Sequence, residues 1–195
     1  MTLTIRFAHA LEYAFVAHAG QSRKATETPY IAHPLAVASL VLEHGADENT
    51  AIAALLHDVA EDAGGTDRLC DIAKRFGEEV ANIVAECSDT LSTPKPPWKA
   101  RKETFLSRIP RLTDHARLIN QADLVHNARS ILNDLTEQGD RVWIRFRGGK
   151  DGTLWYFRSA LAAHLAVHST PLLNELSEVL DRIETQAKMG AESAT

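Results

Sequence analysis

The stretch IAALLHDVAED, residues Ile52 to Asp62, places four ionisable side chains at the end of an otherwise apolar segment. If the segment is helical, Glu61 lies about one turn beyond His57 and Asp58, and Asp62 lies one turn beyond Asp58, so the four side chains line neighbouring faces of adjacent turns. Burying a charge whose partner is absent costs on the order of 3 to 5 kcal/mol, and the segment contains no Lys or Arg. A bound cation is therefore the simplest compensation.

The rest of the chain repeats apolar residues at intervals of three and four, whereas alternating, strand-like patterns are almost absent. This spacing predicts an all-α bundle of about eight to ten helices. Glycines mark several of the expected helix ends, as they commonly do at helix C-termini. The expected helices cover roughly residues 4–19, 30–44, 48–61, 67–76, 78–87, 113–138, 140–146, 153–168 and 171–189, with a short one after Trp98.

Two loops interrupt this helical pattern. Residues 88–102, SDTLSTPKPPWKARK, contain three prolines, which do not fit a helix interior, and four Lys or Arg residues. We expect a mobile basic loop there. Residues 147–152, RGGKDG, are expected to form a second loop, which is rich in glycine and carries Lys150.

The composition is that of an ordinary globular protein. The 195 residues are 45% hydrophobic and 24% charged, which is sufficient for one substantial core. We expect a single domain over residues 1–190 and a disordered tail over residues 191–195. The formal net charge of -5 supplies no general positive field. We therefore expect a small-molecule partner, and neither a nucleic-acid polymer nor a membrane surface.

The cysteines and the N-terminus bear on the compartment. Cys70 and Cys87 make a poor disulfide framework. The first residues lack the long apolar segment of a signal peptide, and nowhere do about 18 apolar residues follow one another. These features favour a cytoplasmic protein and leave its oligomeric state open between a monomer and a small homo-oligomer.

Polar residues in two other apolar stretches are candidate partners for the same cation. His33 precedes Pro34 in PYIAHPLAVA, and Asp123 lies within INQADLVHNARSIL. Taken alone, each is more often a surface or capping residue. Their distances in sequence from His57 and Asp58 are too long for a zinc finger but natural where helices of a bundle converge. Two imidazoles and two carboxylates suit an octahedral ion such as Mn²⁺, with zinc, iron and cobalt as alternatives.

Three motifs occur in order along the chain: GQSRKATETPYIAHPLAVA, AALLHDVAED and ADLVHNARSIL. Together they resemble the HD-domain hydrolases of the RelA/SpoT group, especially the small alarmone hydrolases, and the resemblance covers nearly the whole chain. It implies an HD-domain helical bundle that uses one Mn²⁺ per chain. The implied activity removes the 3′-diphosphate of ppGpp or pppGpp, the alarmones of the stringent response, and releases pyrophosphate with GDP or GTP. The chain ends before the synthetase domain of bifunctional relatives, so we expect hydrolysis only.

The resemblance also implies roles for individual residues. The implied metal ligands are His33, His57, Asp58 and Asp123. The implied catalytic carboxylates, which orient or activate the attacking water, are Glu61 and Asp62, and which of the two is the base stays open. The implied substrate contacts are Arg23, Lys24, Tyr30 and Asn127.

Two positions depart from the motifs of that family. Leu124 and Gln121 stand where relatives commonly carry basic residues, which leaves open whether guanosine alarmones or adenosine alarmones such as ppApp are the substrate. The basic loop and Lys150 are candidates to replace the lost charge. The alternatives are another HD-fold nucleotide phosphohydrolase and a catalytically silent module that binds nucleotide. The complete set of acidic and histidine residues argues against the silent module.

Overall fold

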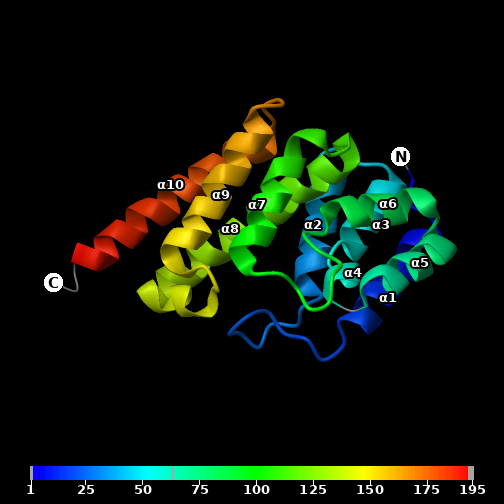
Figure 1. Cartoon of the computed structure of the whole chain (residues 1–195), viewed down its shortest axis with the longest axis horizontal. Helices are drawn as coiled ribbons and strands as arrows, with labels where there is room; N and C mark the ends of the chain where they lie inside the picture. The colour runs from blue at the N-terminus through cyan, green and yellow to red at the C-terminus, as the bar shows by residue number, and fades with distance from the viewer. Residues whose placement is uncertain (1, 63, 193–195) are drawn as a thin grey trace. The chain divides into compact units, whose positions relative to one another are not determined.

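The computed structural model describes residues 2–62 and 64–192, apart from the side chains of Asp62 and residues 190–192. Helix follows helix along this part of the chain (Figure 1), and β-pairing within it is limited to one isolated bridge between Ser22 and Pro29. The all-α prediction is confirmed. The α-helices are α1 Ile5–Ala17, α2 Ala32–Glu43, α3 Glu48–Leu56, α4 Val59–Asp62, α5 Gly65–Phe76, α6 Glu78–Cys87, α7 Trp98–Arg108, α8 Asp114–Gln138, α9 Gly149–Leu165 and α10 Pro171–Glu192. Two 3-10 segments are η1 Ile109–Arg111 and η2 Gly139–Arg145.

The chain divides into two compact units, which are described separately. The first contains the residues up to Pro97 together with Leu112–Ala122, and the second contains Trp98–Arg111 and the chain from Asp123 onward. A single domain over residues 1–190 therefore stays a prediction. The predicted tail, residues 191–195, falls mostly on residues 193–195, which lie outside the described residues.

Helix α3 forms the centre of the first unit. It packs against α1, α2 and α6, and every residue from Ala51 to Leu56 is completely buried. A helix that is apolar on all sides is stable only inside a core. The turn that follows Leu56 therefore begins in the interior of this unit, where His57 is buried.

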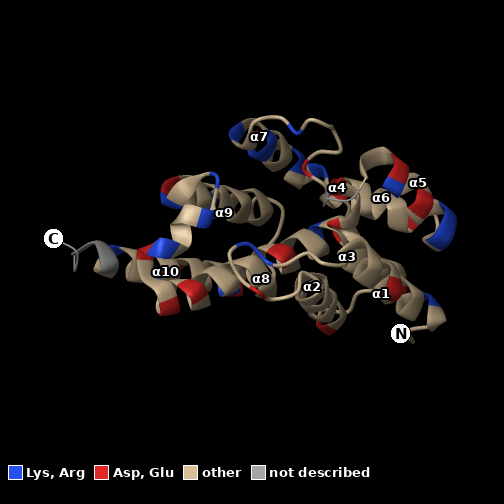
Figure 2. Ribbon diagram, turned by 90° about the horizontal axis from the view of Figure 1, so that it is seen from below, with Lys and Arg blue, Asp and Glu red and all other residues tan. Residues whose placement is uncertain are grey.

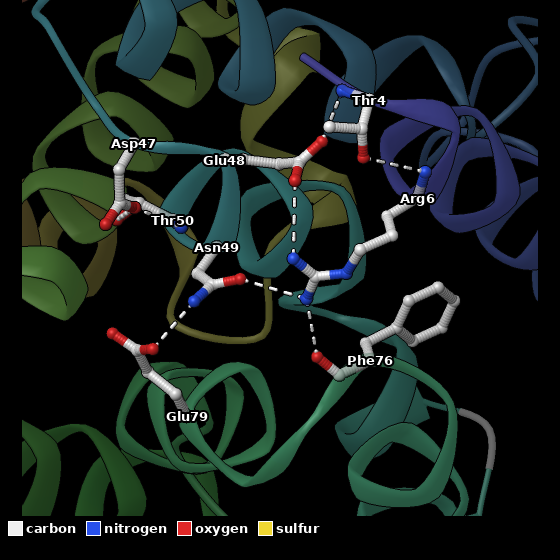
Figure 3. Close-up of polar contacts among 8 residues, drawn as sticks. All are labelled: Thr4, Arg6, Asp47, Glu48, Asn49, Thr50, Phe76 and Glu79. Atoms are coloured by element: carbon white, nitrogen blue, oxygen red, sulfur yellow. Dashed lines mark hydrogen bonds and ion pairs between the residues drawn. The ribbon is translucent and has the colours of Figure 1, made fainter. Parts of the chain in front are cut away.

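The start of α3 is fixed by polar contacts that Figure 3 shows. The Arg6 guanidinium of α1 donates to Glu48 Oε2 at 3.3 Å, to Asn49 Oδ1 at 3.0 Å and to the Phe76 carbonyl oxygen at 2.8 Å. Asp47 caps the helix by accepting from the Thr50 N–H at 2.8 Å. One arginine thus connects α1 to the start of α3 and the end of α5.

The predicted helix over residues 48–61 is wrong as one continuous element. Helix α3 ends at Leu56, His57 and Asp58 form a turn, and α4 begins at Val59. His57 Nδ1 lies 2.8 Å from the Ala54 carbonyl oxygen, which a continuing α-helix would offer to the Asp58 N–H. The imidazole occupies that acceptor, and the helix is interrupted at the residues expected to bind metal.

In the second unit, α7 packs against α9 through an aromatic side chain. A Cβ on Gly148 would lie only 2.7 Å from the Trp98 ring, so the indole occupies the space that this glycine leaves. The loop predicted over residues 147–152 is shorter than expected, because α9 already begins at Gly149. Basic residues are concentrated on α7 (Figure 2). Within the described residues, no helix combines the length and apolar character needed to cross a membrane.

Candidate metal centre

Three of the four predicted metal ligands lie together in the first unit. His33 stands in the first turn of α2, and His57 and Asp58 form the turn after α3. Each offers one ligand atom within 4.8 Å of the others. The Nε2 atoms of His33 and His57 lie 3.4 and 3.3 Å from Asp58 Oδ2, and both imidazoles are almost fully buried. The packing of α2 on α3 thus gathers two nitrogens and one carboxylate oxygen around one point.

Local hydrogen bonding sets how the two imidazoles are presented. A carbonyl oxygen can only accept, so the contact with Ala54 requires the proton of neutral His57 to be on Nδ1. The Nε2 lone pair is then on the side of Asp58. His33 is placed by its backbone N–H, which donates to the Tyr30 carbonyl oxygen at 2.9 Å.

The Asp58 carboxylate is held in its ionised form. Its burial works to raise the pKa, but the charges and hydrogen bonds of His57 and His33 outweigh burial and hold the pKa well below its usual range. The Tyr30 hydroxyl donates a further hydrogen bond of 2.6 Å to Asp58 Oδ2. Asp58 is therefore an anion in the position where a cation would need one.

A divalent metal ion fits this donor set. Two imidazole nitrogens and a carboxylate oxygen are borderline ligands that bind first-row divalent ions well, and a metal-binding histidine usually donates its other N–H to a neighbouring acceptor, as His57 does. Asp47, Glu79 and His115 also offer atoms within 4.8 Å of one another, but all three are exposed. Of these two sets of described residues, the first combines proximity with buried histidines.

The predicted catalytic residue Glu61 lies on α4, one turn beyond the metal-ligand turn. Its Oε1 is 3.0 Å from Lys95 Nζ, and its Oε2 accepts from the Asp89 N–H at 3.2 Å. Burial and the charge of Asp89 raise the pKa of Glu61, and Lys95 opposes them. The backbone of Asp62 ends α4, but its side chain lies outside the described residues, so its catalytic role stays a prediction.

The predicted substrate contacts Arg23 and Lys24 lie on a tight loop in the same unit. Hydrogen bonds from the Arg23 N–H to the Thr28 oxygen and from the Tyr30 N–H to the Gln21 oxygen close this loop ahead of α2. The Arg23 guanidinium lies 5.7 Å from the centroid of the Tyr30 ring. Lys24 is exposed. Tyr30 therefore connects the loop to Asp58.

The remaining predicted site residues belong to the second unit. Asn127 Nδ2 donates to Asp123 Oδ1 at 2.6 Å, one turn away on α8. Lys150 Nζ donates to the Ala187 carbonyl oxygen at 2.8 Å and pairs with Asp140 at 3.7 Å, which connects α9 to α10 and η2. The metal role of Asp123 and the substrate roles of Asn127 and Lys150 stay predictions.

Two contacts next to these residues go beyond what the sequence predicts. Lys95 pairs with Glu61, which lies 34 positions earlier in the chain, whereas the sequence predicts only a phosphate contact for its loop. The buried ring of His18 stacks on Tyr30, with centroids 4.7 Å apart. Both depend on tertiary packing. The dense charge of residues 95–102 was the available hint for the first.

The comparisons with known proteins agree with this geometry. Residues 10–154 match the family model described as "HD domain". The chain is 38% identical over 125 residues to the guanosine-3′,5′-bis(diphosphate) 3′-pyrophosphohydrolase MESH1 of Xenopus tropicalis, covering 63% of this chain and 67% of that protein. It is 40% identical over 119 residues to the bifunctional (p)ppGpp synthase/hydrolase SpoT of Escherichia coli K12, covering 59% of this chain but only 16% of SpoT.

A solved structure is similar over nearly the whole chain. It is described as a metazoan ortholog of SpoT that hydrolyses ppGpp, and it matches with a TM-score of 0.76 and 27% identity over 93% of this chain and 97% of that one. The helical architecture, the cluster of two buried histidines with Asp58 and the match over residues 10–154 lead to one conclusion. The chain belongs to the HD domain family.

Proposed function

We propose that the protein is a cytoplasmic, metal-dependent hydrolase that removes the 3′-pyrophosphate of ppGpp-type alarmones and releases pyrophosphate with GDP or GTP. The observation that carries the proposal is the convergence of His33, His57 and Asp58 in a chain similar to MESH1. We further propose Mn²⁺ as the metal, because a mixed nitrogen and oxygen donor set with Asp123 as the fourth ligand suits it. Both cysteines are thiols, in keeping with a reducing compartment.

The four proposed ligand residues would hold the metal, and Asp58 is kept in its ionised form. When bound, a divalent ion supplies Lewis-acid stabilisation of the phosphoryl oxygens and lowers the pKa of water. His33 and His57 would each offer an Nε2 nitrogen to the metal, and Asp58 would contribute the negative charge that its lowered pKa preserves. Tyr30 restrains Asp58 through its 2.6 Å hydrogen bond.

Glu61 is the proposed general base. Burial and Asp89 raise the pKa of its carboxyl, and a raised pKa strengthens the attraction of the carboxylate for a proton, as a general base requires. In the reaction, the water oxygen bonds to the phosphorus next to the ribose, and the bond from that phosphorus to the 3′ oxygen breaks. Glu61 accepts the proton that water loses, and the departing 3′ oxygen takes up a proton. Asp62 is proposed to assist in orienting the water.

The substrate is proposed to be held by charge and by aromatic contact. Arg23 can stack on a purine, and Lys24 can neutralise phosphate as a point charge. Asn127 is proposed to bind the ribose, and Lys150 a phosphate. Leu124 and Gln121 stand where the family resemblance leads us to expect basic residues, which leaves ppApp as a second candidate substrate.

The test is product analysis with purified protein and Mn²⁺. We expect ppGpp and pppGpp to yield pyrophosphate with GDP and GTP. Assaying ppApp beside them measures the preference between guanine and adenine nucleotides. The control is Asp58→Ala, which we expect to yield no product. Orthophosphate from ordinary 5′-nucleotides would instead identify another HD-fold phosphohydrolase. Binding without turnover of any nucleotide would refute the enzymatic proposal and favour the silent module.

A further inference from the structure

The catalytic carboxylate Glu61 is contacted on both oxygens by one segment, residues 88–97, which we name the proline loop. Lys95 Nζ lies 3.0 Å from Oε1, and the Asp89 N–H donates to Oε2 at 3.2 Å. Figure 1 shows this loop, in green, passing beside α4. The proline loop thus orients the base and sets its electrostatic environment.

The Lys95 contact has opposite consequences for the two tasks of a general base. An ammonium beside the carboxylate keeps Glu61 ionised, which a base requires. The same ammonium occupies Oε1 and weakens its attraction for a proton. The side chains of Glu61 and Lys95 are 20% and 34% exposed, so solvent screens their pairing less than it would a surface ion pair. A pair held throughout turnover would therefore slow proton transfer.

The two ends of the proline loop differ in how they are packed. Near its start, the Leu91 carbonyl oxygen lies so close to Gly65 that a Cβ there would be 3.0 Å away. Residues 92–97, which carry Lys95, are exposed. Moving this exposed part uncovers little apolar surface, whereas moving the packed start would disturb the contact with α5. The ammonium can therefore change partner while the Asp89 backbone stays on Glu61.

We infer that Lys95 is a substrate-released positioning residue: it holds the Glu61 carboxylate in the substrate-free enzyme and transfers to the incoming phosphate chain, which leaves Glu61 able to accept the proton of water. The inference rests on the proposed function. Its chemical basis is that a diphosphate offers an ammonium several anionic oxygens, whereas Glu61 offers one carboxylate. Once Lys95 leaves, burial and Asp89 act on Glu61 without opposition from Lys95, and its pKa rises.

The kinetic test compares the acidic limbs of two pH profiles. The limb in kcat/KM reports the free enzyme, and the limb in kcat reports the bound enzyme. We expect the wild-type limb to lie at higher pH in kcat than in kcat/KM. Lys95→Gln should raise the kcat/KM limb by about 0.5 to 1 pH unit and leave the kcat limb in place. Lys95→Arg, which keeps the charge, should restore the wild-type kcat/KM limb.

Lys74→Gln is the matched control, because it removes one positive charge from an exposed side chain on α5 that belongs neither to the proposed site nor to the basic loop. We expect it to shift neither limb. If Lys95→Gln shifted the acidic limbs of kcat and kcat/KM equally, Lys95 would have to stay on Glu61 during turnover. Unchanged profiles would mean that it never acts on the base. Either result overturns the inference.

A second readout needs no turnover. The carboxyl carbon of Glu61 is titrated by NMR in the Mg²⁺-loaded protein, with and without inorganic pyrophosphate. We expect pyrophosphate to raise the Glu61 pKa of the wild type to that of Lys95→Gln and to leave the variant unchanged. Should this pattern occur in a protein that hydrolyses no alarmone, Lys95 release stands and the proposed function fails. Turnover of ppGpp with no pyrophosphate-dependent change would leave the function intact and remove the inference.

Discussion

Among the described residues of the first unit, two histidine and carboxylate clusters bring their ligand atoms together, and one of them has the donor set and the buried histidines of a metal centre. The first cluster, His33, His57 and Asp58, lies at the C-terminal end of the buried helix α3. The exposed cluster of Asp47, Glu79 and His115 lies at the starts of three helices. In both sets the ligand atoms lie within 4.8 Å of one another. Distance alone therefore does not distinguish a metal centre from a surface cluster.

The exposed cluster is already committed to structural hydrogen bonds. Asp47 Oδ1 accepts from the Thr50 hydroxyl at 2.6 Å, and Thr50 Oγ1 also lies 2.7 Å from His115 Nδ1. Glu79 accepts from Asn49 at 2.6 Å, a contact that Figure 3 shows beside Asp47. Carboxylates at helix starts stabilise the helix dipole and satisfy backbone donors. Burial after an apolar helix, rather than proximity, therefore distinguishes the candidate metal centre from the exposed cluster.

The largest expected effect comes from removing Asp58. Asp58→Ala leaves two buried imidazoles without their anion, and we expect metal affinity to fall by more than about 100-fold, beyond what loss of an outer-shell partner costs. Activity should be lost with the metal. Isothermal titration with Mn²⁺ and product analysis measure the two losses. Asp47→Ala is the matched control and should retain both, since a loss of metal there would move the binding site to the exposed cluster.

Glu61→Gln separates chemistry from binding within the buried region. Gln keeps the shape but removes the basic oxygen, so we expect turnover to fall by about 10² to 10⁴-fold while metal affinity changes little. Steady-state kinetics at saturating Mn²⁺ give the first value and titration gives the second. Full activity in this variant would exclude Glu61 as the base and direct attention to Asp62.

Tyr30→Phe tests the partner that restrains a ligand. The variant removes only the hydroxyl that donates to Asp58 Oδ2, and we expect metal affinity to fall by about 10 to 100-fold. Tyr156→Phe, on α9 of the second unit, is the control and should bind metal normally. Unchanged affinity in Tyr30→Phe would show that the hydrogen bond is dispensable for the metal centre.

The smallest expected effect is on stability at the exposed cluster. Burial works to raise the pKa of Asp47, but its hydrogen bonds with Thr50 and the charge of His115 lower it overall. A carboxyl group whose pKa is lowered by folding stabilises the protein at pH values above its pKa in the unfolded state. This stabilisation is lost as the pH falls through its pKa in the folded state. We expect Asp47→Ala to cost about 1 kcal/mol at pH 7, and the difference from wild type to shrink below about pH 4. Urea unfolding across pH measures it. A difference that persisted at low pH would contradict the role of the ionised cap.

Much of the fold follows from local sequence signals. The prediction of a helix over 78–87 agrees with α6, because Gly77 adopts a positive φ of 99° that stops α5 and starts the next helix. The all-α class follows from apolar spacing over the whole chain. The break at His57 does not, because it depends on a side chain competing for a backbone acceptor within its own helix.

The candidate site shows the same limit. The buried setting of His57 and Asp58 could be predicted from the apolar run before them. His33 lies close to them because the consecutive helices α2 and α3 pack against each other. The pairing of Lys95 with Glu61 could not be predicted, because a proline-rich segment has no periodicity that fixes where its side chains lie. Tertiary contacts of loops therefore supply the part of the site that local patterns miss.

The complete enclosure of α3 has a consequence for any mutational survey of this protein. Truncating Leu55 or Leu56 leaves a cavity, and abundance and catalysis would fail together. One residue later, at His57, those two phenotypes should separate, because the imidazole is proposed to hold the metal ion. A comparison of cellular protein level with enzymatic output along residues 51–58 would therefore locate the boundary between scaffold and reaction centre to a single peptide bond.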